Sequence, residues 1–257
     1  MPNLTSNDSA VLQALFDAES SPSSGITIDS TLPPFPDKLQ VSKTEHEKLS
    51  TRERSIITAL QVEDVSRETI QSAIEALTAL IEEYPTYPSA YVNRAQAFRM
   101  LVDNLFTEEQ TFEMKVDGPL FNDPGNKAIV SRLLSDLGRA ITLCTPSSPT
   151  DPISPIQARI LADTHTHRGY VLLKAARAKA NHTDKSSLKT EEESPQIWEL
   201  DADQLEEVAS RDFLFGGRYG HKIAQQLSVQ TNPYAKMCGA IVKEAMRKEA
   251  EGAPVPT

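Results

Sequence analysis

The sequence predicts an all-α protein, an α-solenoid in which three pairs of helices stack side by side and a C-terminal helix caps the stack. Three observations predict it: a helical period at 88–102, a proline-containing turn before it, and a similar helical sequence later in the chain. The apolar residues at i, i+4, i+7 and i+11 are Tyr91, Ala95, Phe98 and Val102. Because polar residues line a second face, we expect a helix that is packed on one side and open on the other.

The turn before this helix points to a known kind of repeat. The preceding helix ends near Tyr84, because Pro85 and Pro88 interrupt it, and the chain re-enters a helix at Ser89. A helix, a proline-containing turn and a helix of alternating aromatic and small residues are typical of the tetratricopeptide repeat, which has a period of about 34 residues. We interpret the sequence around Arg168 as the first helix of a third repeat, because it resembles the sequence around Arg94, which lies 74 residues earlier.

The remaining elements follow in order along the chain. A short apolar helix at 8–17 could dock in the solenoid groove and inhibit it, and the Ser- and Pro-rich stretch after it indicates a linker. We expect this N-terminal part at 1–42, a repeat domain at 43–247 and a disordered tail at 248–257. The repeats are predicted at about 43–85, 88–145 and 156–220, with inserted loops at 103–127 and 180–200 and capping helices at 221–247.

Composition narrows the classes of partner. The net charge is −10 and the pI is about 5.1, with no dense stripe of Lys or Arg, which argues against nucleic acid and anionic membranes. We find neither a signal-peptide pattern nor a run of the ~18 apolar residues that a membrane span needs, and we therefore expect a cytoplasmic protein, as a monomer. Cys144 and Cys238 lie in apolar helical contexts and are predicted to be buried thiols.

Several segments of the chain resemble the tetratricopeptide repeat protein 36 family. They lie at 10–16, 89–100, 133–143, 167–173, 209–213 and 232–238, and the last of them, NPYAKMC, is the most diagnostic. The resemblance covers roughly 8–17 and 45–247, with the two insertions as departures. It implies an α-solenoid of three repeats that binds the chaperone Hsp70 and, from the animal members, an association with the regulation of tyrosine breakdown.

The first helices of the repeats should form a concave groove that binds a peptide. The residues expected to line it are Asn93, Gln96, Arg99, Thr166, His167, Tyr170 and Lys174. Amide, guanidinium and ring groups suit the backbone and carboxylate oxygens of a peptide. The alternative is that these residues are only the solvated face of two helices.

Two further interpretations concern charged residues near the groove. In chaperone-binding relatives a carboxylate clamp uses Lys, Asn and Arg; Asn93 matches the central Asn, whereas Asp163 and His167 stand at the Lys and Arg positions. The negative charge of Asp163 beside an anionic ligand disfavours a complete clamp. Arg94 and Arg168 are interpreted as structural arginines with buried stems rather than as ligand contacts.

No catalytic constellation stands out in the sequence. His165 and His167 are two residues apart on a predicted helix, so they point in nearly opposite directions and should not share a metal ion. Phosphate-binding, nucleophile-elbow and CxxC motifs do not occur. We expect no enzyme activity and no cofactor, but a protein-binding module that acts as an Hsp70 adaptor. The alternative is a scaffold that protects an enzyme of tyrosine catabolism from degradation.

Overall fold

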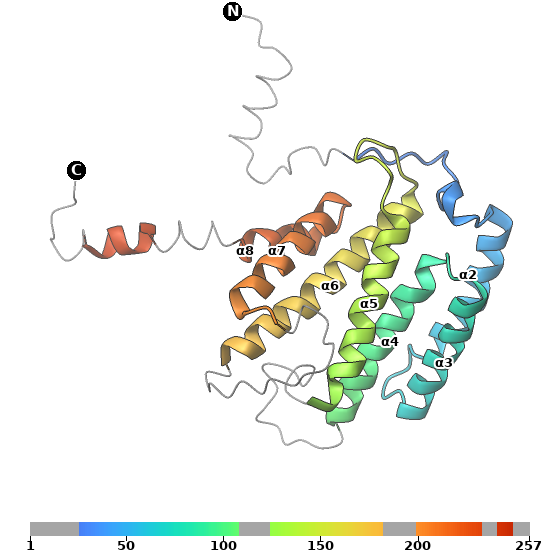
Figure 1. The fold of residues 1–257 in the computed structure, drawn as a ribbon, viewed down its shortest axis with the longest axis horizontal. Helices are drawn as coiled ribbons and strands as arrows, with labels where there is room; N and C mark the ends of the chain where they lie inside the picture. Colours follow the sequence, from blue (N-terminus) through green and yellow to red (C-terminus); the bar gives the residue numbers. More distant parts are fainter. Residues whose placement is uncertain (1–25, 108–123, 182–198, 233–240, 249–257) are drawn as a thin grey trace, which may run out of the picture.

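Figure 1 shows a computed structural model of the chain, which describes residues 26–107, 124–181, 199–232 and 241–248. The prediction of an all-α protein is confirmed for these residues, which form helices and one isolated bridge but no strand. The short 3-10 helices are η1 (Asp37–Leu39) and η3 (Pro124–Asn126). The α-helices are α2 (Lys43–Thr58), α3 (Arg67–Glu83), α4 (Pro88–Thr107), α5 (Lys127–Cys144), α6 (Pro155–Asn181), α7 (Ala202–Arg218) and α8 (Lys222–Gln230). Residues 241–248 are also helical.

Several helices begin at a side chain that caps their free backbone N–H groups. Ser42 accepts a hydrogen bond from the backbone of Glu45 at the start of α2, and Ser66 does the same at the start of α3. Asp201 and Gln204 form a reciprocal capping box at the start of α7. Such caps stabilise a helix by about 1 kcal/mol each, which explains why these polar residues set the starts of the helices.

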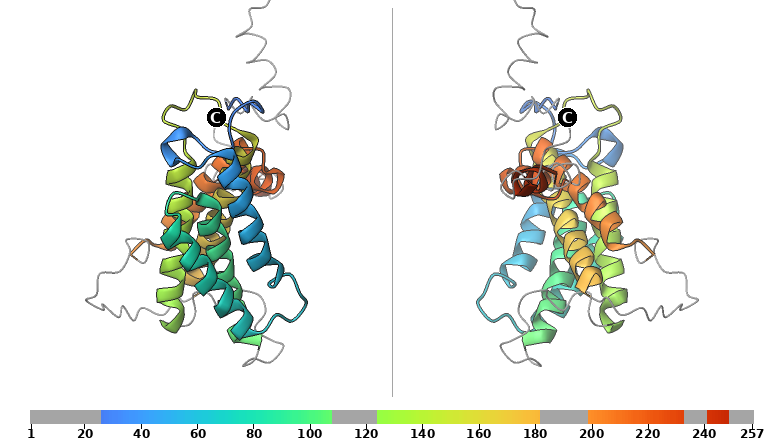
Figure 2. Two further views of the ribbon diagram at one scale, coloured as in Figure 1. Left: turned by 90° about the vertical axis from the view of Figure 1, so that its right-hand side faces the viewer. Right: turned by 90° about the vertical axis from the view of Figure 1, so that its left-hand side faces the viewer.

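The helices lie side by side in the order of the sequence, and each contacts the next one along the chain (Figures 1 and 2). The predicted apolar face of α4 is confirmed, because all four of its members are buried. Their exposed fractions are 8% for Tyr91, 0% for Ala95, 6% for Phe98 and 0% for Val102. A cluster of buried residues from α4 and α5 also includes Val171 of α6, and so joins the second helix pair to the third.

The first pair, α2 and α3, is splayed rather than closely packed. Figure 2 shows α2 diverging from α3 toward the loop that joins them. A groove of about 450 Å³ lies between the two helices, lined by residues that include Ser55, Ile56 and Ser72. The physical reason is the polarity of α2, which buries only Leu49 and Glu53.

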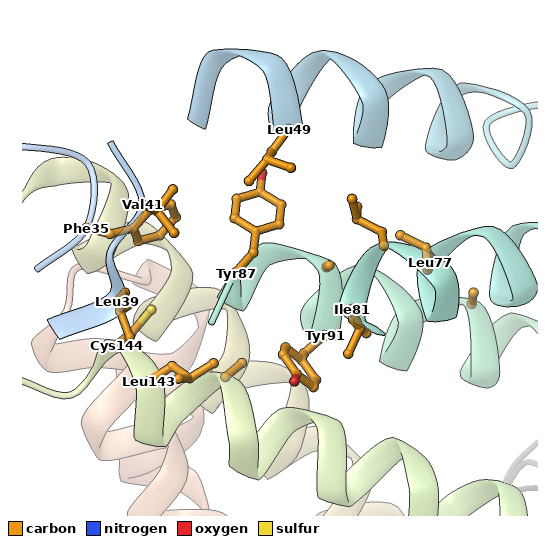
Figure 3. Packing of buried hydrophobic residues seen from close by; sticks show 14 of the residues in the cluster. Phe35, Leu39, Val41, Leu49, Leu77, Ile81, Tyr87, Tyr91, Leu143 and Cys144 are labelled. Atoms are coloured by element: carbon orange, nitrogen blue, oxygen red, sulfur yellow. The ribbon is translucent and has the colours of Figure 1, made fainter. Parts of the chain in front are cut away.

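The N-terminal stretch differs from the expected linker. Within 26–42, Phe35 and Leu39 are buried, and Figure 3 shows Leu39 beside Cys144 at the end of α5. A parallel bridge joins Ile28 to Ile153, in the connection between α5 and α6. The stretch packs because its few apolar side chains fill a gap that the helix ends leave open.

Other boundaries also differ from the expected ones. Both ends of the loop expected at 103–127 are helical instead, because α4 continues to Thr107, η3 follows at Pro124–Asn126 and α5 begins at Lys127. The first glycine or proline after Pro88 is Gly118, so no helix-breaking residue ends α4 near Leu101. The predicted helix at 8–17 lies outside the described residues, as do 108–123, 182–198, 233–240 with Cys238, and the tail from 249. In the described part of the chain no helix is both long and apolar enough to span a bilayer.

Candidate functional site

Two buried ion pairs repeat the same geometry in successive helix pairs. Arg94 of α4 donates to both carboxylate oxygens of Asp136 of α5, at 2.8 Å from Nε and 2.7 Å from Nη2. Arg168 of α6 donates to Asp212 of α7 in the same way, at 2.7 Å from each nitrogen. The interpretation of Arg94 and Arg168 as structural residues is confirmed, because both guanidinium groups bind side chains of neighbouring helices. Arg94 also donates from Nη1 to the Thr78 hydroxyl of α3, at 3.1 Å.

The third pair adds a histidine to this ion pair. His165 Nδ1 lies 2.8 Å from Asp212 Oδ1, and its ring stacks on Tyr219. Burial alone would raise the pKa of Asp212, but the hydrogen bonds from His165 and Arg168 lower it below its ordinary value. The carboxylate therefore stays ionised inside the protein and joins α6 to α7.

The predicted groove residue Asn93 faces α2 instead of an open groove. Its amide nitrogen donates to Glu53 Oε1 at 2.7 Å. Glu53 is 5% exposed, and its other oxygen accepts hydrogen bonds from Tyr87 at 2.9 Å and Ser89 at 2.8 Å. Asn93 is thus used within the protein beside a buried carboxylate, and in this arrangement it cannot act as the central Asn of a carboxylate clamp. Figure 3 shows Tyr87, the residue just before α4, pointing toward Leu49 of α2.

The predicted groove residue Thr166 turns toward α7. Its hydroxyl donates to the Ala162 carbonyl at 2.6 Å, and it lies against Gly216, where an added Cβ would come within 2.6 Å of it. The expected face of α6 was therefore too wide, because Thr166 belongs to the side that packs on the following helix.

Arg99 and His167 lie close to each other where α4 meets α6. Arg99 Nε and His167 Nε2 are both buried and have no hydrogen-bond partner. Burial, and secondarily the nearby Arg99 guanidinium, lower the pKa of His167 to about 4. His167 is therefore neutral at neutral pH. At this contact, the Arg99 guanidinium carries a positive charge and lies beside the uncharged His167 imidazole.

Three more predicted residues belong to the same surface. Tyr170 is 39% exposed, and the Lys174 ammonium lies 5.0 Å from the centre of its ring. Gln96 is half-buried and lies one helical turn before Arg99. We name this surface the α4–α6 face: Gln96, Arg99, His167, Tyr170 and Lys174.

The two neighbouring histidines of α6 do not converge. His165 binds Asp212, whereas His167 faces Arg99 on the other side of the helix. They therefore cannot hold one metal ion between them, as the sequence predicted.

The predicted clamp-position residue Asp163 is exposed on α6. Its Oδ2 lies 3.9 Å from Arg159 Nε, one helical turn earlier.

Sequence reasoning missed the acidic partners of the site. Asp136 and Asp212 were not singled out, although they lie 76 residues apart, close to the 74 residues that separate the two arginines. Glu53 carries no comparable signal, because it lies in a polar helix among several other charged residues.

Comparisons with known proteins give one informative relative. No family model matches the chain, and no solved structure matches it, so the resemblance to tetratricopeptide repeat proteins stays a prediction. The chain is similar to a protein of Aspergillus fumigatus named the L-tyrosine degradation gene cluster protein hmgX. The two are 62% identical over 253 residues, which cover 98% of this chain and 95% of the relative.

Proposed function

Because the chain belongs to the family of the L-tyrosine degradation gene cluster protein hmgX, we propose that it acts in L-tyrosine degradation as a non-catalytic scaffold. In this role it binds an enzyme of that process in the cytoplasm and protects it from breakdown. The observation that carries the proposal is the 62% identity, which extends over nearly the whole of both chains.

The architecture supports a scaffold. We propose that α2–α3, α4–α5 and α6–α7 are three tetratricopeptide-type pairs of one α-solenoid. In support, the pairs α4–α5 and α6–α7 carry the same buried ion pair in the same geometry. Repeated pairs of this kind create an extended surface for another protein. The α4–α6 face suits that purpose, since it presents Tyr170 and Lys174 to the surface beside Arg99 and His167.

An adaptor for Hsp70 is the competing proposal. Its clamp version is weakened by the hydrogen bond between Asn93 and Glu53, which occupies the amide that would bind the chaperone. An Hsp70 contact would have to use other residues of the α4–α6 face or a different surface.

Affinity purification from native cells growing on tyrosine tests the proposal. The full-length protein should recover an enzyme that acts on tyrosine or its breakdown products, without stoichiometric Hsp70. A Lys174→Glu variant should recover less of this enzyme, because it reverses a charge on the α4–α6 face. Arg211→Glu is the matched control, since Arg211 is 62% exposed on α7.

A deletion strain supplies the second measurement. The enzyme's protein level should fall while its transcript stays unchanged, and the full-length protein should restore it. Recovery of Hsp70 alone would favour the adaptor instead. Unchanged enzyme levels together with no recovered enzyme would contradict the scaffold, and turnover of tyrosine or one of its products by the purified protein would make it an enzyme.

A further inference from the structure

The contact between α2 and α4 and the contact between α4 and α6 are built from equivalent positions. Asn93 stands one residue before Arg94, and His167 stands one residue before Arg168, the two arginines of the repeated ion pairs. Each of these residues faces the first helix of the preceding pair: Asn93 meets Glu53 of α2, and His167 meets Arg99 of α4. The two contacts can therefore be compared directly.

The first contact is complete and the second lacks an acid. At the first, the Glu53 carboxylate accepts hydrogen bonds from Tyr87, Ser89 and Asn93. At the second, the residue near His167 is the basic Arg99 instead of an acid, and the buried Arg99 Nε and His167 Nε2 have no hydrogen-bond partner. Buried polar groups are almost always paired, so an unpaired nitrogen on each side of one contact indicates an acceptor from outside.

We propose that the α4–α6 face is a site for a carboxylate, supplied by an Asp or Glu side chain of the protein that binds there. The inference rests on the proposed function, which it deepens by naming the chemistry that the scaffold recognises. The guanidinium of Arg99 is always charged and donates through Nε, and an imidazole donates through Nε2 in one of its tautomers or when protonated. A carboxylate between the two would accept a hydrogen bond from each.

A protein side chain fits better than a small acid for two reasons. Glu53 shows that a glutamate on a neighbouring segment fills the equivalent place in the first contact. Lys174 and the half-exposed Tyr170 extend the surface beyond the two nitrogens, so the site accommodates a segment that carries several acidic groups.

The probe for this site is a hexaglutamate peptide with blocked ends, titrated into the full chain at constant ionic strength. The readout is the imidazole NMR signal of His167, assigned by its loss in His167→Gln. We expect a saturable shift of this signal, no shift with hexaglutamine, and an affinity for hexaglutamate about tenfold weaker in Arg99→Gln. The exposed Arg211→Gln is the control and should keep the wild-type affinity.

Three other results would contradict the proposed carboxylate site or its proposed occupant. Equal affinities for Arg99→Gln and Arg211→Gln would remove the site, and Arg99→Lys provides the same test if Arg99→Gln does not fold by circular dichroism. An equal shift by acetate at the same carboxylate concentration would assign the site to small acids. The chain's own acidic run, Glu191–Glu193, would be the occupant if replacing these residues by Gln moved the His167 signal without peptide.

The proposed function and this inference can fail separately. If the peptide binds but no enzyme of tyrosine degradation is recovered from cells, the carboxylate site stands and the scaffold fails. If an enzyme is recovered equally well by wild type and Arg99→Gln, the scaffold stands and the carboxylate site fails.

Discussion

Asp212 accepts hydrogen bonds from two basic side chains, His165 and Arg168, while Asp136 binds Arg94 in the preceding pair. Both carboxylates are nearly inaccessible to water, at 1% and 4% exposure. A buried charge is stable only while its partners remain, so the loss of the acid is costly on both sides of the pair.

Replacing Asp212 by Ala should therefore destabilise the protein strongly. The substitution leaves the Arg168 guanidinium and the His165 ring without their acceptor, and breaking a buried pair in this way costs about 3–5 kcal/mol. Urea denaturation followed by circular dichroism measures the change. Arg211→Ala is the control, because an exposed residue should change the free energy of unfolding by no more than about 0.5 kcal/mol. A loss below about 1 kcal/mol in Asp212→Ala would contradict the structural role of the pair.

His167 gives the prediction for pH. Its pKa of about 4 lies below the ordinary 6.5, first because of burial and second because of Arg99. Between these values the unfolded chain binds more protons than the folded one, so His167 lowers stability as the pH falls from about 6.5 to about 4. An NMR titration should place its pKa well below 6.5, and Arg99→Gln should raise it. A pKa near 6.5 in the wild-type protein would show that the ring is in contact with water.

At the scale of helices, closeness of packing depends on glycine at particular positions. An added Cβ at Gly216 would lie 2.6 Å from Thr166 Oγ1, 3.1 Å from Ala224 Cβ and 3.2 Å from the Ala162 carbonyl. By contrast, nothing lies within 4 Å of an added Cβ at Gly138 of α5. The same residue type therefore permits a close approach of α6, α7 and α8 in one place and only weakens a helix in the other.

Replacing Gly216 and Gly138 by alanine should change the free energy of unfolding in opposite directions. Gly216→Ala should destabilise by about 1–3 kcal/mol, because overpacking forces neighbouring atoms to move. Gly138→Ala should stabilise by about 0.5–1 kcal/mol, since alanine is the better helix former. Thermal unfolding of both variants in parallel measures the difference. The same sign for both would mean that packing around Gly216 is looser than described.

The sequence was sufficient for elements with a strong local signal. The period of Tyr91, Ala95 and Phe98 predicted which side of α4 is packed, and the echo between Arg94 and Arg168 predicted two equivalent helices. Both signals lie within a few residues of each helix, where side-chain spacing determines which residues share a face.

The parts that could not be predicted depend on contacts between distant segments. Asn93 finds its acceptor 40 residues away in a polar helix, and no local pattern marks Glu53 as buried. Phe35 stands among prolines without any period, so only the assembled helices show the gap that it fills. The direction of Thr166 likewise depends on how α7 packs, which a helical period alone does not specify.

At the scale of the whole molecule, the N-terminal segment 26–42 links α2 and the start of α4 to the connection between α5 and α6. Phe35 makes edge-to-face contacts with His46 of α2 and Tyr87, with ring centres 5.2 and 5.8 Å apart. Ser154 donates to the Pro34 carbonyl at 2.7 Å, and Lys38 donates to the Thr145 carbonyl at 2.8 Å. The segment is therefore part of the folded core.

Removing the Phe35 ring should loosen this segment and destabilise the whole chain. Phe35→Ala should cost about 3–5 kcal/mol, the usual loss for a fully buried aromatic side chain. Hydrogen exchange at the Ile153 amide, which donates to Thr27 at 2.9 Å, should become faster in the variant. Exposed Val62→Ala is the control and should leave both quantities nearly unchanged. Unaltered exchange at Ile153 would mean that the bridge forms without Phe35.

The hydrogen bond between Pro34 and Ser154 spans 120 residues and bears on how the protein is made. A ribosome releases the N-terminal segment long before Ile153 and Ser154, so Ile28 and Pro34 have no partners in the α5–α6 connection while α2 to α5 emerge. The pair α4–α5, whose contacts are closer in sequence, has no such delay. Premature termination after α5 would therefore yield a chain whose helices can form but whose first segment lacks the hydrogen bonds to Ile153 and Ser154 that anchor it.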